Sequence, residues 1–311
     1  MDKHSFGRRN FLKKMTALAA VSVPGIARAK APYDPAARFE IKVNEVPFRR
    51  NAQGRQLIAR IYQPQGAGPF PVVLDLHGGA WQRKDRKAEE PMDRAIASSG
   101  VLVVAIDMTL SGEAPYPACI QDASYGVRWL KVHAAEWKGD PSTLGVYGSS
   151  SGGHVAELIA MRPNDKRYNA IPLENAPGVD TSVAYVATRS PISDPYARWQ
   201  QAERKKNENL IKASKVYFNP WDTIHEGNPQ QILERKEAVT LKPLLIMQGE
   251  LDDNVLPSVQ EKFAQTYRAA GGDCQFHVFE KSVHEWVAEP GPQTDRAYEM
   301  VKAFIARQIG V

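Results

Sequence analysis

The chain has 311 residues, of which 43% are hydrophobic and 24% are charged. This composition is typical of a globular protein, and it excludes a collagen, a coiled coil or a disordered chain. No segment reaches the roughly 18 consecutive apolar residues of a membrane span, which excludes a polytopic membrane protein. The net charge of +5 comes entirely from residues 1–29, which hold six basic residues and one acid. The remainder is neutral overall, so we expect no nucleic-acid partner.

Residues 1–29 have the three parts of an export signal. A basic segment at 7–14 reads Gly-Arg-Arg-Asn-Phe-Leu-Lys-Lys, an apolar stretch containing Pro24 follows, and Ala27-Arg28-Ala29 forms a small-x-small cleavage site. The Arg-Arg-x-Phe-Leu-Lys string resembles the bacterial twin-arginine (Tat) signal, which a receptor reads. A short amphipathic helix or a membrane anchor is the alternative, but the apolar run is short and interrupted. We predict a mature chain from Lys30 that is periplasmic or secreted, with transient contact to the Tat export machinery and no stable membrane anchor.

The chain contains two cysteines, Cys119 and Cys274. An oxidising compartment would permit a disulfide between them. The first is expected at the start of a helix and the second at the start of a late strand. We therefore favour two buried thiols over a bridge.

The predicted elements begin with a hairpin and continue as repeated strand–helix units. β-rich runs at 38–48 and 55–62 flank the turn sequence Asn-Ala-Gln-Gly, which is typical of a hairpin. Apolar runs then predict strands at 71–76, 101–106, 144–147, 183–187, 244–247 and 276–279, and helices are predicted at 86–98, 117–137, 153–161, 257–270 and 292–308. Continuous apolar runs indicate parallel strands that are buried on both faces. The sequence therefore predicts an α/β fold, with a mostly parallel central sheet, an antiparallel edge and helices on both faces.

Residues 190–240 break this alternation. They are rich in charged residues, proline and aromatic residues, including Trp199, Tyr217, Phe218 and Trp221. We predict that they form a helical cap inserted over the carboxyl edge of the sheet. Open α/β sheets bind their ligands at that edge.

A candidate nucleophile lies between a predicted strand and a predicted helix, in Gly148-Ser149-Ser150-Ser151-Gly152. In this context Gly-x-Ser-x-Gly forms a nucleophile elbow, a sharp turn that lifts the serine hydroxyl above the sheet. Only Ser150 has glycine both two residues before and two residues after it. A Ser/Gly turn that merely caps a helix is the alternative, because motifs this short also arise by chance.

A second motif, His77-Gly78-Gly79-Ala80-Trp81, follows an earlier strand. It resembles the His-Gly-Gly-x-Trp motif of the hormone-sensitive-lipase-like and acetyl-xylan/feruloyl-esterase-like branches of the α/β hydrolases. An ordinary turn after a strand is the alternative. The resemblance covers about residues 36–309 and implies an α/β-hydrolase domain over 30–311. It also implies an oxyanion hole formed by the N–H groups of Gly79, Ala80 and Ser151, although many members have a third glycine at the position of Ala80.

The order of catalytic residues in this fold is serine, then acid, then histidine. The segment from Gly249 to Val255 matches the family's acid turn, Gly-x-x-Asp-x-x-Val, at Asp252, with Asp253 as the fallback. A solvated acidic turn is the alternative. His284 follows the last predicted strand, whereas the other histidines belong to the signal, the oxyanion loop, helices, the cap or the strand itself (His4, His77, His133, His154, His225 and His277). The resemblance therefore implies a Ser150–Asp252–His284 triad.

These features predict a serine carboxylic-ester hydrolase that acts on a small-molecule ester of a short-chain or aromatic acid through an acyl-enzyme. No metal-ligand spacing or phosphate-binding glycine loop is present, so no cofactor and no metal are expected. Trp81 and Trp286 are candidates for substrate binding, but they could equally be core residues. The alternatives are an arylformamidase-like amidase, a prolyl-oligopeptidase-like peptidase on the same triad, and a non-catalytic binding protein on the same fold.

Overall fold

An eight-stranded sheet organises the computed structural model, in the order β1-β2-β4-β3-β5-β6-β7-β8. The structure describes Met1 and residues 33–310, so the predicted signal and its cleavage site lie outside the described residues. β1 and β2 form an antiparallel hairpin, and β2 pairs antiparallel with β4. The other neighbouring strands pair in parallel. The sheet is thus mostly parallel with an antiparallel edge.

The bounds of the elements follow the alternation expected from the sequence. The strands are β1 (Ile41–Arg50), β2 (Gln56–Pro64), β3 (Val72–Leu76), β4 (Leu102–Ile106), β5 (Gly145–Ser149), β6 (Val186–Arg189), β7 (Leu244–Gly249) and β8 (Cys274–Phe279). The helices are α1 (Glu90–Ser98), α2 (Ala118–His133), α3 (Ser151–Met161), α4 (Pro195–Arg204), α5 (Glu208–Tyr217), α6 (Thr223–Glu226), α7 (Pro229–Glu234), α8 (Pro257–Ala269) and α9 (Pro292–Gln308).

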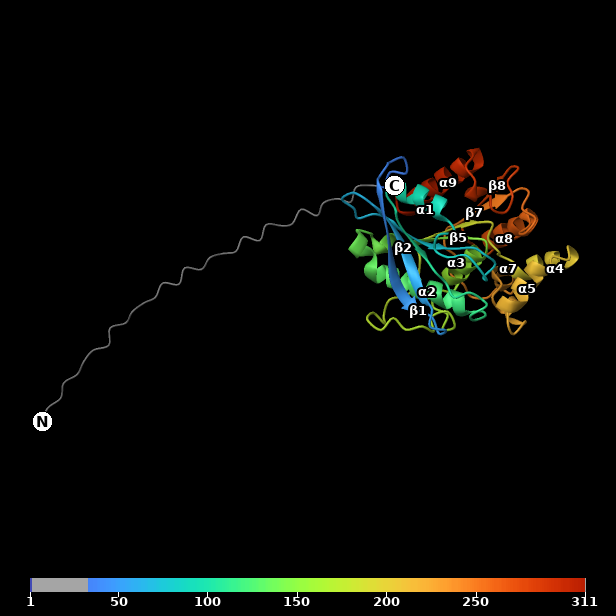
Figure 1. Cartoon of the computed structure of the whole chain (residues 1–311), viewed down its shortest axis with the longest axis horizontal. Helices are drawn as coiled ribbons and strands as arrows, with labels where there is room; N and C mark the ends of the chain where they lie inside the picture. The colour runs from blue at the N-terminus through green and yellow to red at the C-terminus, as the bar shows by residue number, and fades with distance from the viewer. Residues whose placement is uncertain (2–32, 311) are drawn as a thin grey trace. The chain divides into compact units, whose positions relative to one another are not determined.

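Side chains of the central strands alternate between two hydrophobic cores, because successive residues of a strand point to opposite faces. In β3, Leu74 packs in the core formed with α2, α3 and α8. Its neighbour Val73 packs in the core formed with α1 and α9. Figure 1 shows α1 and α9 on one side of the strands and α2 and α3 on the other. Strands buried on both faces explain the continuous apolar runs in the sequence.

Most predicted elements differ from the observed ones by a few residues at their ends, and two of these differences have a clear local cause. α1 begins at Glu90 rather than at residue 86, because Pro91 lies in its first turn. Proline is tolerated there, but further inside a helix it would remove a hydrogen bond and clash with the preceding turn. β6 begins at Val186 rather than at residue 183, since its pairing with both β5 and β7 starts there.

The segment between β6 and β7 contains four short helices, α4 to α7. Asp194, Asn207 and Asn228 cap α4, α5 and α7, each accepting a hydrogen bond from a backbone N–H group of the first turn. Caps of this type stabilise a helix by about 1 kcal/mol each. A capping residue therefore marks the start of three of the four helices in this segment.

Within residues 33–310, no helix is long and apolar enough to cross a membrane. Cys119 is the second residue of α2, and Cys274 is the first residue of β8. Both are free and buried, in agreement with the expectation of two thiols.

The sheet register places the candidate site motifs side by side. Leu76, the last residue of β3, pairs with Gly148 near the end of β5. Because the two strands are parallel, the His-Gly-Gly loop after β3 and the serine turn after β5 leave the sheet at the same edge. The segments that contain Asp252 and His284 follow β7 and β8, whose parallel pairing ends at Gly249 and Phe279.

Candidate active site

Ser150 occupies a strained turn between β5 and α3, with φ of 50° and ψ of −116°. A non-glycine residue rarely adopts such a backbone, and in this fold it projects the hydroxyl away from the sheet. The turn requires glycine at position 152, because a Cβ there would lie 1.9 Å from the carbonyl oxygen of Leu76. The N–H group of Ser150 donates to the carbonyl oxygen of Arg189 at 2.9 Å, which ties the turn to β6.

A chain of hydrogen bonds joins Asp252, His284 and Ser150. His284 Nδ1 lies 2.8 Å from Asp252 Oδ2, and His284 Nε2 lies 2.9 Å from Ser150 Oγ. An ionised carboxylate only accepts hydrogen bonds, so Nδ1 carries the proton and Nε2 is free to accept the serine hydroxyl proton. The structure thus brings together the three residues that the sequence motifs single out.

Asp252 is buried, and four donors surround its carboxylate. Oδ1 accepts from the N–H groups of Asn254 and Val255 at 3.0 and 2.8 Å, and Oδ2 accepts from Gln248 Nε2 at 2.9 Å in addition to His284. Burial opposes ionisation, but the hydrogen bonds from His284 and Val255 outweigh it and lower the pKa of Asp252. Asp252 is therefore ionised at neutral pH and stabilises a positive charge on the imidazole.

The fallback acid, Asp253, lies elsewhere. Its side chain is exposed, and it forms an ion pair of 3.3 Å with Lys205 at the end of α4. The structure places Asp252, and not Asp253, against the imidazole.

The loop after β3 has a backbone that L-residues seldom adopt. Gly79, Ala80 and Trp81 have φ values of 106°, 54° and 60°. Glycine is required at position 79, since a Cβ would lie 2.1 Å from the carbonyl oxygen of Arg83. The Trp81 N–H group donates to Ser151 Oγ at 3.2 Å, which fixes this loop to the first turn of α3.

The three predicted oxyanion donors border the nucleophile. A Cβ on Gly78 would lie 3.3 Å from Ser150 Cβ, so the loop passes directly beside the serine. The N–H groups of Gly79, Ala80 and Ser151 donate no hydrogen bond to any acceptor within residues 33–310. They are available to a substrate oxygen, although their convergence on one point stays a prediction.

Both candidate tryptophans are buried. Trp81 stacks on Tyr217 of α5, with ring centroids 4.4 Å apart and an interplanar angle of 2°. Its Nε1 donates to His154 Nδ1 at 3.3 Å. Trp286 lies in the other core, against Phe279 at 5.0 Å. These contacts favour a packing role for Trp286, whereas Trp81 couples the oxyanion loop to the helices that follow β6. Direct contact of either residue with substrate stays a prediction.

His154, which the sequence places in a helix, connects the loop after β3 with the segment after α6. Its Nε2 lies 2.7 Å from the carbonyl oxygen of Gly227, so this nitrogen carries the proton and Nδ1 accepts from Trp81. Burial lowers the pKa of His154 to about 4, which keeps the ring neutral at pH 7. The ring thus links α3 and the oxyanion loop to the segment between α6 and α7.

A buried ion pair between Arg189 and Glu89 lies next to the triad candidates, and no sequence motif predicts it. Arg189 Nη2 lies 3.2 Å from each of the two carboxylate oxygens of Glu89. Arg189 Nη1 donates to the carbonyl oxygen of His284 at 2.6 Å. The hydroxyl group of Ser149, the residue before Ser150, donates a hydrogen bond to Glu89 Oε1. The pair therefore holds the serine turn and the histidine loop in one network.

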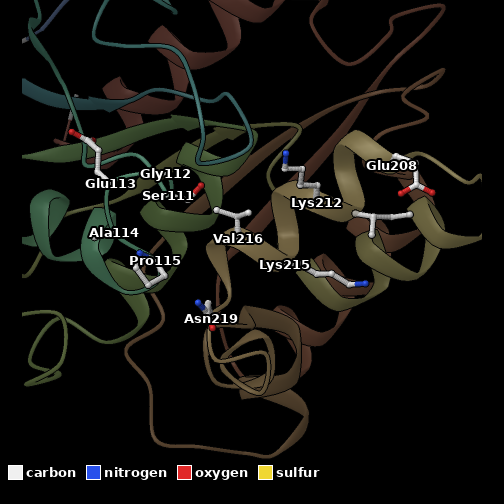
Figure 2. A pocket seen from close by; sticks show the side chains of 11 residues that line it. Ser111, Gly112, Glu113, Ala114, Pro115, Glu208, Lys212, Lys215, Val216 and Asn219 are labelled. Atoms are coloured by element: carbon white, nitrogen blue, oxygen red, sulfur yellow. The ribbon is translucent and has the colours of Figure 1, made fainter.

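A surface hollow of about 520 Å³ lies beside the oxyanion loop, between residues 111–115 and α5 (Figure 2). The N–H group of Ser111 donates to the carbonyl oxygen of Trp81 at 2.7 Å, which joins its rim to that loop. None of the three triad candidates lines it. Glu113 at this rim pairs with Arg55 at 2.7 Å. In the part of the chain that the structure describes, no group of three or more His, Cys, Asp or Glu side chains could hold a metal ion.

The BD-FAE family model matches residues 60–267, which is more than half of the chain. The chain belongs to the BD-FAE family. This BD-FAE member is 38% identical to carboxylesterase NlhH of Mycobacterium tuberculosis over 108 residues, which are 34% of each protein. It is 24% identical to esterase LipQ of the same species over 247 residues, which are 76% of this chain and 55% of LipQ. The matches thus span between 34% and 55% of these relatives' lengths.

Solved esterase structures share the fold. A truncated carbohydrate esterase from gut microbiota superimposes with a TM-score of 0.70 at 19% identity, over 90% of this chain and 99% of the other. Thermogutta terrifontis esterase 2 with bound butyrate gives a TM-score of 0.66 at 21% identity, over 88% and 94% of the two chains. These likenesses confirm the predicted α/β-hydrolase fold of the BD-FAE member.

Proposed function

We propose that this BD-FAE protein is a serine carboxylic-ester hydrolase with Ser150 as nucleophile, His284 as general base and Asp252 as the acid of the triad. One observation carries the proposal, namely the hydrogen-bond chain of 2.8 and 2.9 Å that runs from Asp252 through His284 to Ser150 Oγ. The names of the relatives, carboxylesterase and esterase, support the same reaction class.

The geometry supports the following steps of an ester hydrolysis. His284 Nε2 takes the hydroxyl proton as Ser150 Oγ attacks the ester carbonyl carbon. Asp252 stabilises the imidazolium through the hydrogen bond to Nδ1. The tetrahedral intermediate collapses when the alcohol leaves with the proton from Nε2, which produces an acyl-enzyme. Water then attacks the acyl carbon as His284 takes one of its protons. The second tetrahedral intermediate collapses when His284 gives this proton to Ser150 Oγ, which breaks the acyl–serine bond and releases the acid.

The oxyanion of each tetrahedral intermediate would accept hydrogen bonds from the N–H groups of Gly79, Ala80 and Ser151. Comparable donors stabilise a transition state by about 2.7–4 kcal/mol each. The loop geometry favours this role, because the bond from Trp81 N–H to Ser151 Oγ fixes the two donor segments relative to each other. Such preorganised donors need little rearrangement during the reaction.

The substrates that we propose are esters of short-chain or aromatic acids. The test uses the chain from Lys30 with p-nitrophenyl acetate and butyrate, together with a fluorophosphonate probe that labels activated serines. Ser150→Ala should abolish turnover and labelling. The matched control is Ser258→Ala, which changes an exposed serine of α8 and should retain turnover and labelling.

The outcomes separate the alternatives. Labelling without ester turnover would move the assignment to an amidase or peptidase on the same triad, which anilide substrates would reveal. Folded protein with neither labelling nor turnover would contradict the mechanism and favour a binding protein.

We also propose that residues 1–29 direct Tat-dependent export, as their Arg-Arg-x-Phe-Leu-Lys string suggests. When the full-length chain is expressed in a bacterium, the periplasm should contain a protein whose intact mass is that of a chain beginning at Lys30. Replacing both Arg8 and Arg9 by lysine should retain the precursor in the cytoplasm. Export of this double variant at the normal level would contradict the Tat assignment.

A further inference from the structure

Arg198 is a buried arginine whose terminal nitrogens are unused. It lies on α4 and is 4% exposed. Its Nε donates to Asn254 Oδ1 at 2.9 Å, whereas Nη1 and Nη2 have no hydrogen-bond partner among the described residues. The other buried arginine near the site, Arg189, differs because the carboxylate of Glu89 pairs with its guanidinium group.

The guanidinium group of Arg198 lies between the two loops that flank the nucleophile. Its Cζ is 5.6 Å from the ring centroid of Trp81, the residue after the proposed oxyanion donor Ala80. Its partner Asn254 donates a backbone hydrogen bond of 3.0 Å to Asp252 Oδ1. Arg198 therefore contacts the oxyanion loop on one side and the acid loop on the other.

No carboxylate among residues 33–310 forms an ion pair with this guanidinium group. Burial lowers the pKa of Arg198 to about 10, and the nearby charge of Asp252 counteracts part of this effect. The group is therefore charged at neutral pH. Asp252 cannot serve as its direct partner, since four other donors occupy its oxygens. A buried guanidinium group with free N–H donors is costly unless an anion pairs with it.

We propose that Arg198 binds a carboxylate group of the substrate, so that the preferred esters carry a carboxylate close to the ester bond. A carboxylate is planar and can accept two parallel N–H bonds from the two terminal nitrogens of a guanidinium group. This inference rests on the proposed hydrolase function, because Arg198 acts here by selecting the substrate of the same site.

Two pairs of substrates test the inference, and each pair sets an anionic ester against an uncharged ester with the same chain or ring. Ethyl hydrogen glutarate against ethyl pentanoate places the carboxylate on the acyl side, and 4-acetoxybenzoate against 4-acetoxybenzamide places it on the alcohol side. In at least one pair, kcat/KM should be about tenfold or more higher for the anion, the usual effect of a hydrogen bond to a charged group. Arg198→Met should remove this preference, and Arg198→Lys should keep part of it. Arg204→Met, an exposed position of the same helix, is the matched control and should keep it in full.

Three results would overturn the inference. The first is a wild-type enzyme that shows no preference for the anion in either pair. The second is an Arg198→Met variant that loses activity equally on both members, as expected if Arg198 only stabilises the fold. The third is a folded wild-type protein in which the fluorophosphonate probe does not label Ser150. This result would refute the hydrolase function and the inference together. Labelled protein that shows no preference would refute the inference alone.

Discussion

Glu157 is a carboxyl group buried in α3, and it should make the stability of the protein fall as the pH rises. It is 2% exposed, and burial raises its pKa from 4.5 to about 8. Ser193 Oγ lies 2.8 Å from both Glu157 Oε1 and Gln260 Oε1. One hydroxyl has one proton, so a protonated Glu157 that donates to Ser193, with Ser193 donating to Gln260, satisfies both contacts.

The magnitude follows from the two pKa values. A folded state with the higher pKa binds more protons, so its stability is complete below pH 4.5 and is lost as the pH rises toward 8. Between these limits the loss approaches about 1.4 kcal/mol per pH unit. Glu157→Gln keeps the shape of the protonated carboxyl but does not titrate. From pH 5.5 to 7.5, the wild type should therefore lose about 3 kcal/mol relative to this variant.

Urea denaturation at several pH values between 5.5 and 7.5 measures this difference. The control is Glu261→Gln, which changes an exposed carboxyl group of α8 and should follow the wild-type curve. If the free energies of unfolding of wild type and Glu157→Gln ran parallel over this range, Glu157 would be ionised in the folded protein and the argument from burial would be wrong.

Two further substitutions test the site. Asp252→Asn should lower kcat by about 10⁴-fold, because an amide no longer fixes the imidazole tautomer. Steady-state kinetics measures this loss, and circular dichroism checks that the fold is retained. A loss of kcat below tenfold would contradict the triad. Arg189→Met should reduce the free energy of unfolding by about 3–5 kcal/mol, since it leaves the carboxylate of Glu89 buried without its positively charged partner. Urea denaturation measures the loss, and Glu89→Gln in the same background should restore part of it.

The sequence predicts the local features of this fold well, because they depend on neighbouring residues. Strands buried on both faces appear as apolar runs, and Gly148 and Gly152 mark the serine turn by their spacing around Ser150. The start of α1 was predicted four residues early, although Pro91 indicates the correct first turn.

The supporting contacts could not be predicted in this way. Arg189 and Glu89 are separated by 100 residues, and His154 and Gly227 by 73. No local pattern records such pairings, which arise only when the parallel strands and the helices after β6 come together. The signal for Arg198 was still weaker, since an arginine in a polar helix usually lies at the surface.

The contact between the two glycine-containing loops constrains how this enzyme can change. A side chain at position 152 would collide with the backbone of Leu76, and one at position 79 with that of Arg83. A side chain at position 152 therefore requires the backbone at the end of β3 to move, and one at position 79 requires its own loop to open at Arg83, so single substitutions at these two glycines should disrupt the site. The helices after β6 meet the site through side chains such as Arg198 instead. New specificities are therefore most accessible through residues 190–240, where replacements leave the catalytic backbone untouched.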